Sequence, residues 1–236
     1  MTDAAISAAT APYPPDGLFA RLRAGAGRDW RTYVGHRFVR RLADGSLPEA
    51  AFRYYLGQDY LFLIQFARAY ALAAYKSETL EDMRQAAAAM AAILDVEMGL
   101  HVRTCADWGL DEAAMAALPE DPACLAYTRY VLERGAAGDA LDLHVALAPC
   151  ILGYAEIGLA LAADPATRRD GNRYAAWIEM YAGADYQAVA GAAAAHLDRL
   201  FAARAGRGRE ASLAHTFITA TRLEIDFWQM GLDAAG

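Results

Sequence analysis

Apolar residues recur at every third or fourth position along most of this chain, and this spacing predicts amphipathic α-helices. No stretch alternates between apolar and polar residues for long enough to predict a β-strand. We therefore expect an all-α fold, a single-domain helical bundle. The expected helices are 17–42 with a break near 25–27, 49–76, 80–108, 122–134, 140–163, 170–182, 185–203 and 209–232.

Several of these boundaries have a recognisable local signal. Pro48 suits the first turn of a helix, and Thr79 and Asp139 are good N-cap residues. Pro149 lies inside an otherwise continuous apolar pattern, where its ring removes a backbone hydrogen bond and should kink the helix. The expected kink falls one residue before Cys150.

The composition is that of one sizeable globular domain. The chain has 236 residues, of which 56% are hydrophobic, so residues 16–236 can form a single core. Residues 1–15, rich in Ala, Thr and Pro, are expected to be a flexible tail. The net charge of −7 and the lack of an evident basic patch make nucleic acid an unexpected partner.

The three cysteines form no CxxC pair, which favours free thiols in a reducing compartment. No uncharged apolar run reaches about 18 residues, so no membrane span is expected. The N-terminus lacks the basic segment of a secretory signal. Together these features predict a cytoplasmic protein.

Three chemically active side chains lie within apolar helical stripes. Cys150, Asp59 and Glu224 each have large apolar neighbours at positions three, four and seven residues away. Such residues share one helix face, which should point into the protein. Because an isolated buried carboxylate is costly unless it is paired or protonated, these residues suggest a polar pocket inside the core.

Each of these residues also has a plainer explanation. Cys150 could be a small core residue, or a nucleophile if a nearby group activates its thiol. Asp59 and Glu224 could form structural pairs, for example with an arginine, or serve as a general acid or as acceptors for a ligand amine. Three further residues on inward faces could line a flat aromatic ligand: Tyr127, Tyr154 and Tyr181.

A metal site is not expected. Glu97 and His101 are spaced four residues apart, but a di-metal helical site needs repeated Glu-x-x-His signals on other helices. His144 and His196 have no acidic partner at such spacing, and no nucleotide-binding motif occurs. We therefore expect neither a metal nor a cofactor.

Five segments, in order, resemble conserved blocks of the TenA family of thiaminase II enzymes. They are YYLGQDYLFL at 54–63, DVEMGLH at 95–101, LAPCILGYAEIG at 147–158, WIEMYA at 177–182 and LEIDFWQM at 223–230. Singly these blocks are weak signals, but together they cover about residues 30–232 and are specific.

The resemblance implies a heme-oxygenase-like helical fold without heme, assembled as a homotetramer. It implies a hydrolase of thiamin salvage that converts 4-amino-5-aminomethyl-2-methylpyrimidine into the 5-hydroxymethyl pyrimidine and ammonia, and that can also cleave thiamin. By position, Cys150 would be the nucleophile and Glu224 the acid. Asp59 would bind the substrate amine, and the wall of the pocket would be formed by Tyr127, Tyr154 and Tyr181.

Two positions depart from the family pattern. The family commonly has a tyrosine three residues after the aspartate, where this chain has Phe62 in the substrate-binding position, and a tryptophan where this chain has Leu152. A phenyl ring cannot hydrogen-bond a thiolate. Either another group, such as Tyr181, supplies that bond, or the pocket prefers a different pyrimidine.

Two other functions remain open from the sequence. One is an oxidative branch of the same fold, which would need additional histidines or carboxylates in the pocket. The other is a pyrimidine-binding or regulatory protein that keeps the pocket but does not turn over its ligand.

Overall fold

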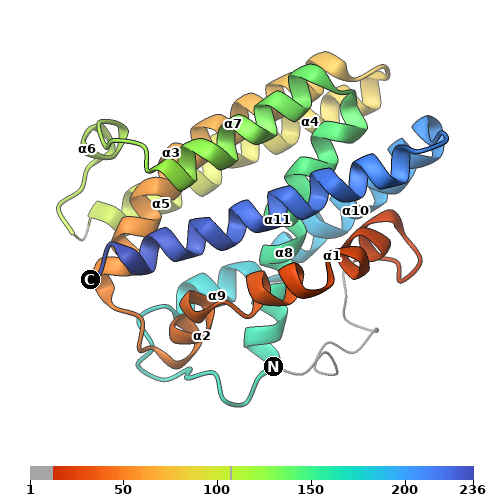
Figure 1. Ribbon diagram of the computed structural model, residues 1–236. Coiled ribbons are helices and arrows are strands. Elements are labelled where there is room, and N and C mark those ends of the chain that lie inside the picture. Colours follow the sequence, from red (N-terminus) through yellow and green to blue (C-terminus); the bar gives the residue numbers. More distant parts are fainter. Residues whose placement is uncertain (1–12, 107) are drawn as a thin grey trace. The chain divides into compact units, whose positions relative to one another are not determined.

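The computed structural model of the protein describes residues 13–106 and 108–236, and within these residues it is helical with no β-strand (Figure 1). This confirms the all-α prediction. The predicted tail, residues 1–15, lies mostly outside the described residues. The described residues form two compact units, which we treat separately: unit 1 comprises 13–47 and 145–228, and unit 2 comprises 48–144 and 229–236. The prediction of a single domain stays a prediction.

Unit 2 is organised around helix α3 (Glu49–Lys76), which contacts α4 (Leu80–Ala92), α5 (Met98–Ala106), α6 (Glu112–Ala116) and α7 (Pro122–Ala137). Every residue of α3 from 55 to 63 is buried. A helix that is buried around its whole circumference is a core helix, which explains why its sequence is apolar on nearly all sides.

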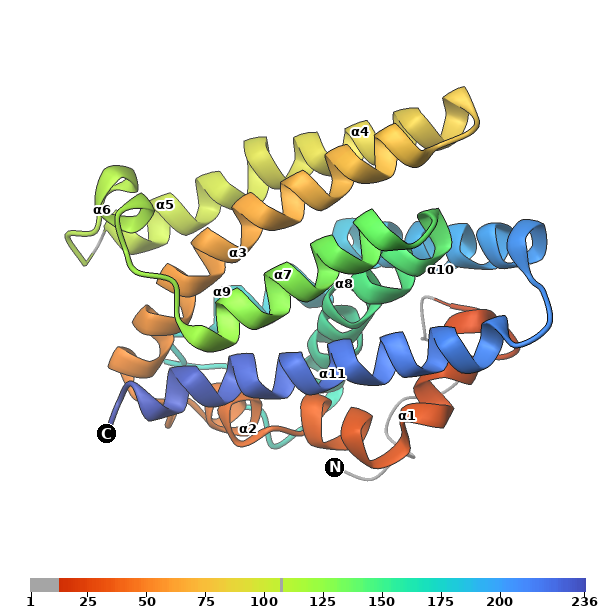
Figure 2. The same cartoon turned by 45° about the horizontal axis from the view of Figure 1, so that its top comes forward.

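Helices α3 and α4 run side by side in opposite directions (Figures 1 and 2). The predicted cap at Thr79 is confirmed, because its side chain accepts a hydrogen bond from the backbone N–H of Asp82. The helix predicted for 80–108 is present as α4 and α5 joined by a π-helical turn, Ile93–Glu97. Such single turns of π-helix occur frequently at functional sites.

Unit 1 contains α1 (Leu18–Val34), α2 (Arg37–Asp44), α9 (Ala175–Ala182), α10 (Ala184–Arg204) and most of α8 (Ala140–Ala163) and α11 (Arg209–Asp233). The first predicted helix, 17–42, is wrong in its length. The chain turns at Gly35, where an added Cβ would lie 3.0 Å from the carbonyl oxygen of Arg31. The predicted break near 25–27 is present, since Gly27 has a φ of +46° inside α1.

Helix α9 begins at Ala175 rather than at residue 170. The preceding loop is held by the Asn172 side chain, whose Nδ2 donates to the carbonyl oxygens of Leu42, Ala43 and Arg168. The bonds to Leu42 and Ala43 hold the loop outside a helix, because they connect it to a part of the chain about 130 residues away. Helical periodicity alone gives no signal for such a contact.

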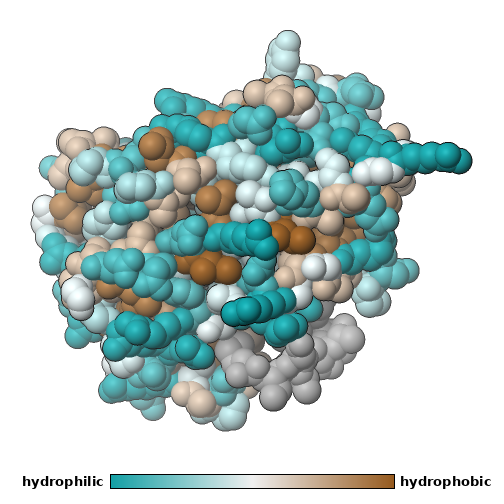
Figure 3. Space-filling model, in the orientation of Figure 1, coloured by the Kyte–Doolittle hydropathy of each residue, from teal (hydrophilic) through white to brown (hydrophobic). Residues whose placement is uncertain are grey.

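Helix α8 is long and apolar enough to cross a membrane by length and composition. It contains Asp142 and Glu156, so its sequence has no uncharged apolar run of about 18 residues. However, 83% of its most apolar window is buried inside the protein, which is the pattern of a core helix. On the face drawn in Figure 3, hydrophilic and apolar residues are interspersed.

A buried ion pair links α1 to α8 within unit 1. The carboxylate of Glu156, which is 3% exposed, accepts two hydrogen bonds of 2.7 Å from the guanidinium of Arg23. It also accepts from the indole N–H of Trp30 at 3.2 Å. A carboxylate buried in an apolar helix needs such partners to compensate for its lost hydration.

We predict that Glu156→Ala lowers the free energy of unfolding by about 3 kcal/mol, because it leaves the Arg23 charge half-buried without its partner. The measurement is denaturant unfolding followed by circular dichroism. The matched control is Glu210→Ala, which removes an exposed pair with Arg21 and should cost less than about 1 kcal/mol. Equal losses in the two variants would contradict the role of burial.

Candidate active site

Cys150 is the most accessible of the three thiols. It is half-buried in α8, whereas Cys105 and Cys124 are buried. Burial raises the pKa of Cys105 to about 11 and that of Cys124 to about 12. Because only a thiolate is a strong nucleophile, these two thiols are chemically inert at neutral pH. Cys150 is therefore the thiol best placed to react.

The turn of α8 around Cys150 is held by Tyr33 of α1. The Tyr33 hydroxyl donates to the carbonyl oxygen of Pro149 at 3.1 Å, and the Tyr33 side chain is fully buried. A Cβ on Gly153 would lie 2.3 Å from the Tyr33 ring. The glycine therefore makes room for the ring, and the ring in turn fixes the backbone next to Cys150.

Tyr154 and Tyr181, both predicted site residues, lie together in unit 1. Their ring centroids are 4.9 Å apart, and Tyr154 also lies 5.3 Å from the Trp228 ring of α11. A Cβ on Gly158 would lie 2.5 Å from the carbonyl carbon of Tyr181. The backbone of α9 thus packs directly on α8 at this glycine, which brings Tyr181 to Tyr154.

Glu224 lies on α11, one helical turn before Trp228, and is 1% exposed. The sequence expectation that this carboxyl group is buried is confirmed. Residues four apart share a helix face, so Glu224 lies on the same face of α11 as the ring that contacts Tyr154. Its role as an acid stays a prediction.

Asp59 of unit 2 is paired with a histidine rather than with the arginine considered above. Its Oδ2 lies 2.6 Å from Nε2 of His101, and Nδ1 of the same ring lies 2.9 Å from the carbonyl oxygen of Glu97. Both side chains are buried. Donation from both ring nitrogens to these acceptors requires the imidazolium form.

The protonation of His101 follows from its surroundings. Burial alone would lower its pKa, but the hydrogen bond and negative charge of Asp59, together with Glu97, outweigh burial and raise the pKa of His101 to about 9. From the sequence, His101 is considered only as a metal ligand beside Glu97, although it lies in the 95–101 block. Its bond to Asp59, 42 residues away, could be found only from the folded structure.

Phe62 and Tyr127 also lie together in unit 2. Phe62 is one turn after Asp59 on α3, and its ring centroid is 5.1 Å from that of Tyr127 on α7. Both rings are buried. The structure thus groups the predicted residues within each unit: Asp59, Phe62 and Tyr127 in unit 2, and Cys150, Tyr154, Tyr181 and Glu224 in unit 1.

A family model described as TENA/THI-4/PQQC matches residues 26–234. The chain belongs to this family. The match covers all the candidate residues and confirms the resemblance drawn from the five sequence blocks.

Individual members of the TENA/THI-4/PQQC family are similar over most of the chain. An aminopyrimidine aminohydrolase of Halalkalibacterium halodurans is 34% identical over 85% of this chain and 89% of its own. A solved structure described as a TenA family transcription regulator, from Silicibacter sp. TM1040, is 46% identical, with a TM-score of 0.88 over 94% of this chain and 98% of its own.

A third similarity concerns the fold alone. A Shewanella denitrificans domain described as having a heme oxygenase-like fold is 13% identical, with a TM-score of 0.69 over 91% of this chain and 92% of its own. The predicted heme-oxygenase-like fold class is confirmed.

We predict that the Asp59–His101 pair makes the stability of this TenA-family protein depend on pH. Because folding raises the pKa of His101 from 6.5 to about 9, its contribution is fully present below pH 6.5 and is lost as the pH rises through about 9. The loss should be at most about 3 kcal/mol. Chemical unfolding between pH 6 and 10 measures it.

The matched variants are His101→Gln, which keeps a donor but no titratable ring, and His215→Gln, which replaces an exposed histidine. His101→Gln should remove the decline in stability between pH 6.5 and 9, and His215→Gln should leave it unchanged. A wild-type curve that runs parallel to that of His101→Gln would refute the assignment.

Proposed function

We propose that this TenA-family chain is an aminopyrimidine aminohydrolase that acts by covalent catalysis at Cys150. The observation that carries the proposal is its 34% identity over 201 residues to an enzyme of that name, which supports a hydrolase of thiamin salvage. The partial exposure of Cys150, in contrast to the buried Cys105 and Cys124, adds to this support. The proposed substrate is 4-amino-5-aminomethyl-2-methylpyrimidine.

The proposed reaction replaces the amine by water. Glu224 protonates a ring nitrogen, which makes the pyrimidine electrophilic, and the Cys150 thiolate adds to a ring carbon. The aminomethyl nitrogen, protonated as an ammonium group, then leaves as ammonia when the electron pair pushed into the ring breaks its bond to carbon, and an exocyclic methylene remains. Water adds to that methylene, the thiolate leaves, and the aromatic hydroxymethyl pyrimidine is restored.

The other candidate residues have binding roles in this proposal. Asp59 accepts hydrogen bonds from the substrate amine, and its bond to His101 holds the carboxyl group in place. Tyr127, Tyr154 and Tyr181 contact the ring. Phe62, which is buried against Tyr127, determines which pyrimidine the pocket prefers.

A regulatory protein is the second candidate, because the solved structure that is 46% identical is described as a transcription regulator. A binding role predicts saturable binding of the pyrimidine without turnover, and it predicts that loss of the Cys150 thiol has no effect. The product assay below separates the two functions.

We also propose that the protein is a cytoplasmic homotetramer. Support for self-association comes from α4, of which Ala86 is the one buried residue among those described in that helix. Leu80 and Met83, three residues apart on one face of α4, are 60% and 42% exposed, and neighbouring exposed apolar side chains favour a protein contact.

We predict that wild-type protein forms the hydroxymethyl pyrimidine and that Cys150→Ala reduces its rate of formation by about a thousandfold or more, because the covalent route is lost. The assay is mass-spectrometric product analysis with the aminomethyl pyrimidine, its formylated form and thiamin. The relative rates of wild type also show which substrate suits a pocket with Phe62.

Cys105→Ala is the matched control, since it removes a buried thiol that takes no part in the proposed chemistry and should retain turnover. Circular dichroism checks that both variants are folded. Undiminished hydrolysis by folded Cys150→Ala would eliminate the covalent mechanism. Binding of a pyrimidine by wild type with no product would favour the regulatory function.

A further inference from the structure

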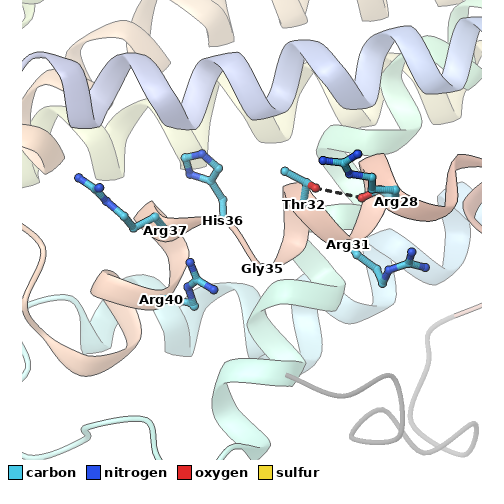
Figure 4. A pocket seen from close by; sticks show the side chains of 7 residues that line it. All are labelled: Arg28, Arg31, Thr32, Gly35, His36, Arg37 and Arg40. Atoms are coloured by element: carbon cyan, nitrogen blue, oxygen red, sulfur yellow. Dashed lines mark hydrogen bonds between the residues drawn. The ribbon is translucent and has the colours of Figure 1, made fainter.

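Four arginines surround one hollow of the surface where α1 ends and α2 begins (Figure 4). The hollow has a volume of about 440 Å³, and its lining consists of Arg28, Arg31, Thr32, Gly35, His36, Arg37 and Arg40. Figure 4 shows the arginine side chains on both sides of the turn at Gly35, some from α1 and some from α2. All of these residues belong to unit 1.

The turn at Gly35 creates this cluster. Arg28 and Arg31 lie three residues apart on α1, and Arg37 and Arg40 lie three residues apart on α2, so each pair lies on one helix face. The turn brings the two faces to the same hollow. No basic patch is evident in the sequence, where basic pairs such as Arg40-Arg41 are isolated, so the expectation of no basic patch is wrong for this hollow.

No ion pair within the described part of the chain offsets the positive charge of the cluster. Among residues 13–106 and 108–236, none of the four arginines forms an ion pair, and no Asp or Glu lines the hollow. Arginines elsewhere in the chain do pair, for example Arg129 with Glu120 and Arg222 with Asp29. In a chain of net charge −7, four arginines around one hollow are a local concentration of positive charge, and they repel one another.

The buried side chain of His36 adds a polar group to the same wall. Its Nδ1 accepts a hydrogen bond from the backbone N–H of Phe38 at 3.2 Å, so a neutral ring carries its proton on Nε2. The first turn of α2 contains no acidic residue, and instead Arg37 stands beside the positive end of the helix. An anion in the hollow would reduce both repulsions at once.

We propose that this hollow binds a phosphate group. A guanidinium presents a planar fork of N–H donors that matches phosphate oxygens, and several arginines together suit a dianion. The cluster is confined to one hollow and does not extend along a stripe, which favours a small phosphate compound over a nucleic acid. The proposal is independent of the pyrimidine chemistry at Cys150.

The test is isothermal titration calorimetry of the full chain with inorganic phosphate, pyrophosphate and AMP, at a constant ionic strength of about 0.1 M. At least one of these probes should bind saturably with a Kd of about 1 mM or lower. Inorganic phosphate and pyrophosphate report on a free anion, and AMP reports on a phosphate ester. Absence of saturable heat with all three would overturn the proposal.

Two double variants locate the binding. Arg31→Gln with Arg37→Gln should weaken binding by about tenfold or more, because charge-assisted bonds are lost from both helices. Arg84→Gln with Arg103→Gln removes the same charge from exposed positions of unit 2 and should leave the Kd unchanged. Equal weakening in the two would show a non-specific charge effect and contradict a site.

A third double variant, Arg31→Lys with Arg37→Lys, keeps the charge but removes the fork geometry, and it should also weaken binding. Duplex DNA is the remaining probe. Tighter binding of DNA than of any phosphate compound, lost in the Arg31 and Arg37 glutamine variant, would replace the proposed ligand with a nucleic acid.

Discussion

Each charge that this chain places inside its apolar helices must have a partner, and this requirement shapes the core of each unit. Helices α3 and α8 are buried around most of their circumference, so their carboxylates lose hydration on folding. In unit 2, Asp59 is paired with His101. In unit 1, Glu156 is paired with Arg23 and Trp30. The same helices therefore supply both the core and the candidate chemistry.

The two buried pairs have different consequences. The Glu156 pair ties α1 to α8, and Tyr33 of that same α1 bonds the carbonyl oxygen beside Cys150. The Asp59 pair instead acts on His101, because its hydrogen bond and negative charge raise the pKa of that histidine to about 9. One pair thus connects two helices, and the other sets the protonation of a buried histidine.

Local signals predicted much of the fold. The spacing of apolar residues predicted the boundaries of α3 and α8 to within about one residue. The N-cap residues Thr79 and Asp139 predicted where α4 and α8 begin. The start of α9 was predicted wrongly because contacts between residues far apart in the sequence determine it. The loop before α9 is held by Asn172 bonds to residues near 42, and no helical pattern encodes those bonds.

The burial of the candidate residues could be predicted from the sequence, but the side chains that they contact could not. The burial of Glu224 and Asp59 could be predicted from their apolar neighbours in the sequence. The contact between Tyr154 and Tyr181 could not be predicted in this way, because it depends on the close packing of α9 against Gly158. The arginine hollow was missed for a related reason. Its charges are spread over 13 positions of sequence, from Arg28 to Arg40, and converge only through the turn at Gly35.

The central claim is that Cys150 forms a covalent bond with a pyrimidine, and intact-protein mass spectrometry tests it most directly. Wild-type protein is quenched in acid during turnover of the aminomethyl pyrimidine, and any modified peptide is then mapped. The account predicts a transient species with the mass of the protein plus the substrate minus ammonia, carried on Cys150. Rapid turnover with no such species, or an adduct on Cys105 or Cys124, would contradict it.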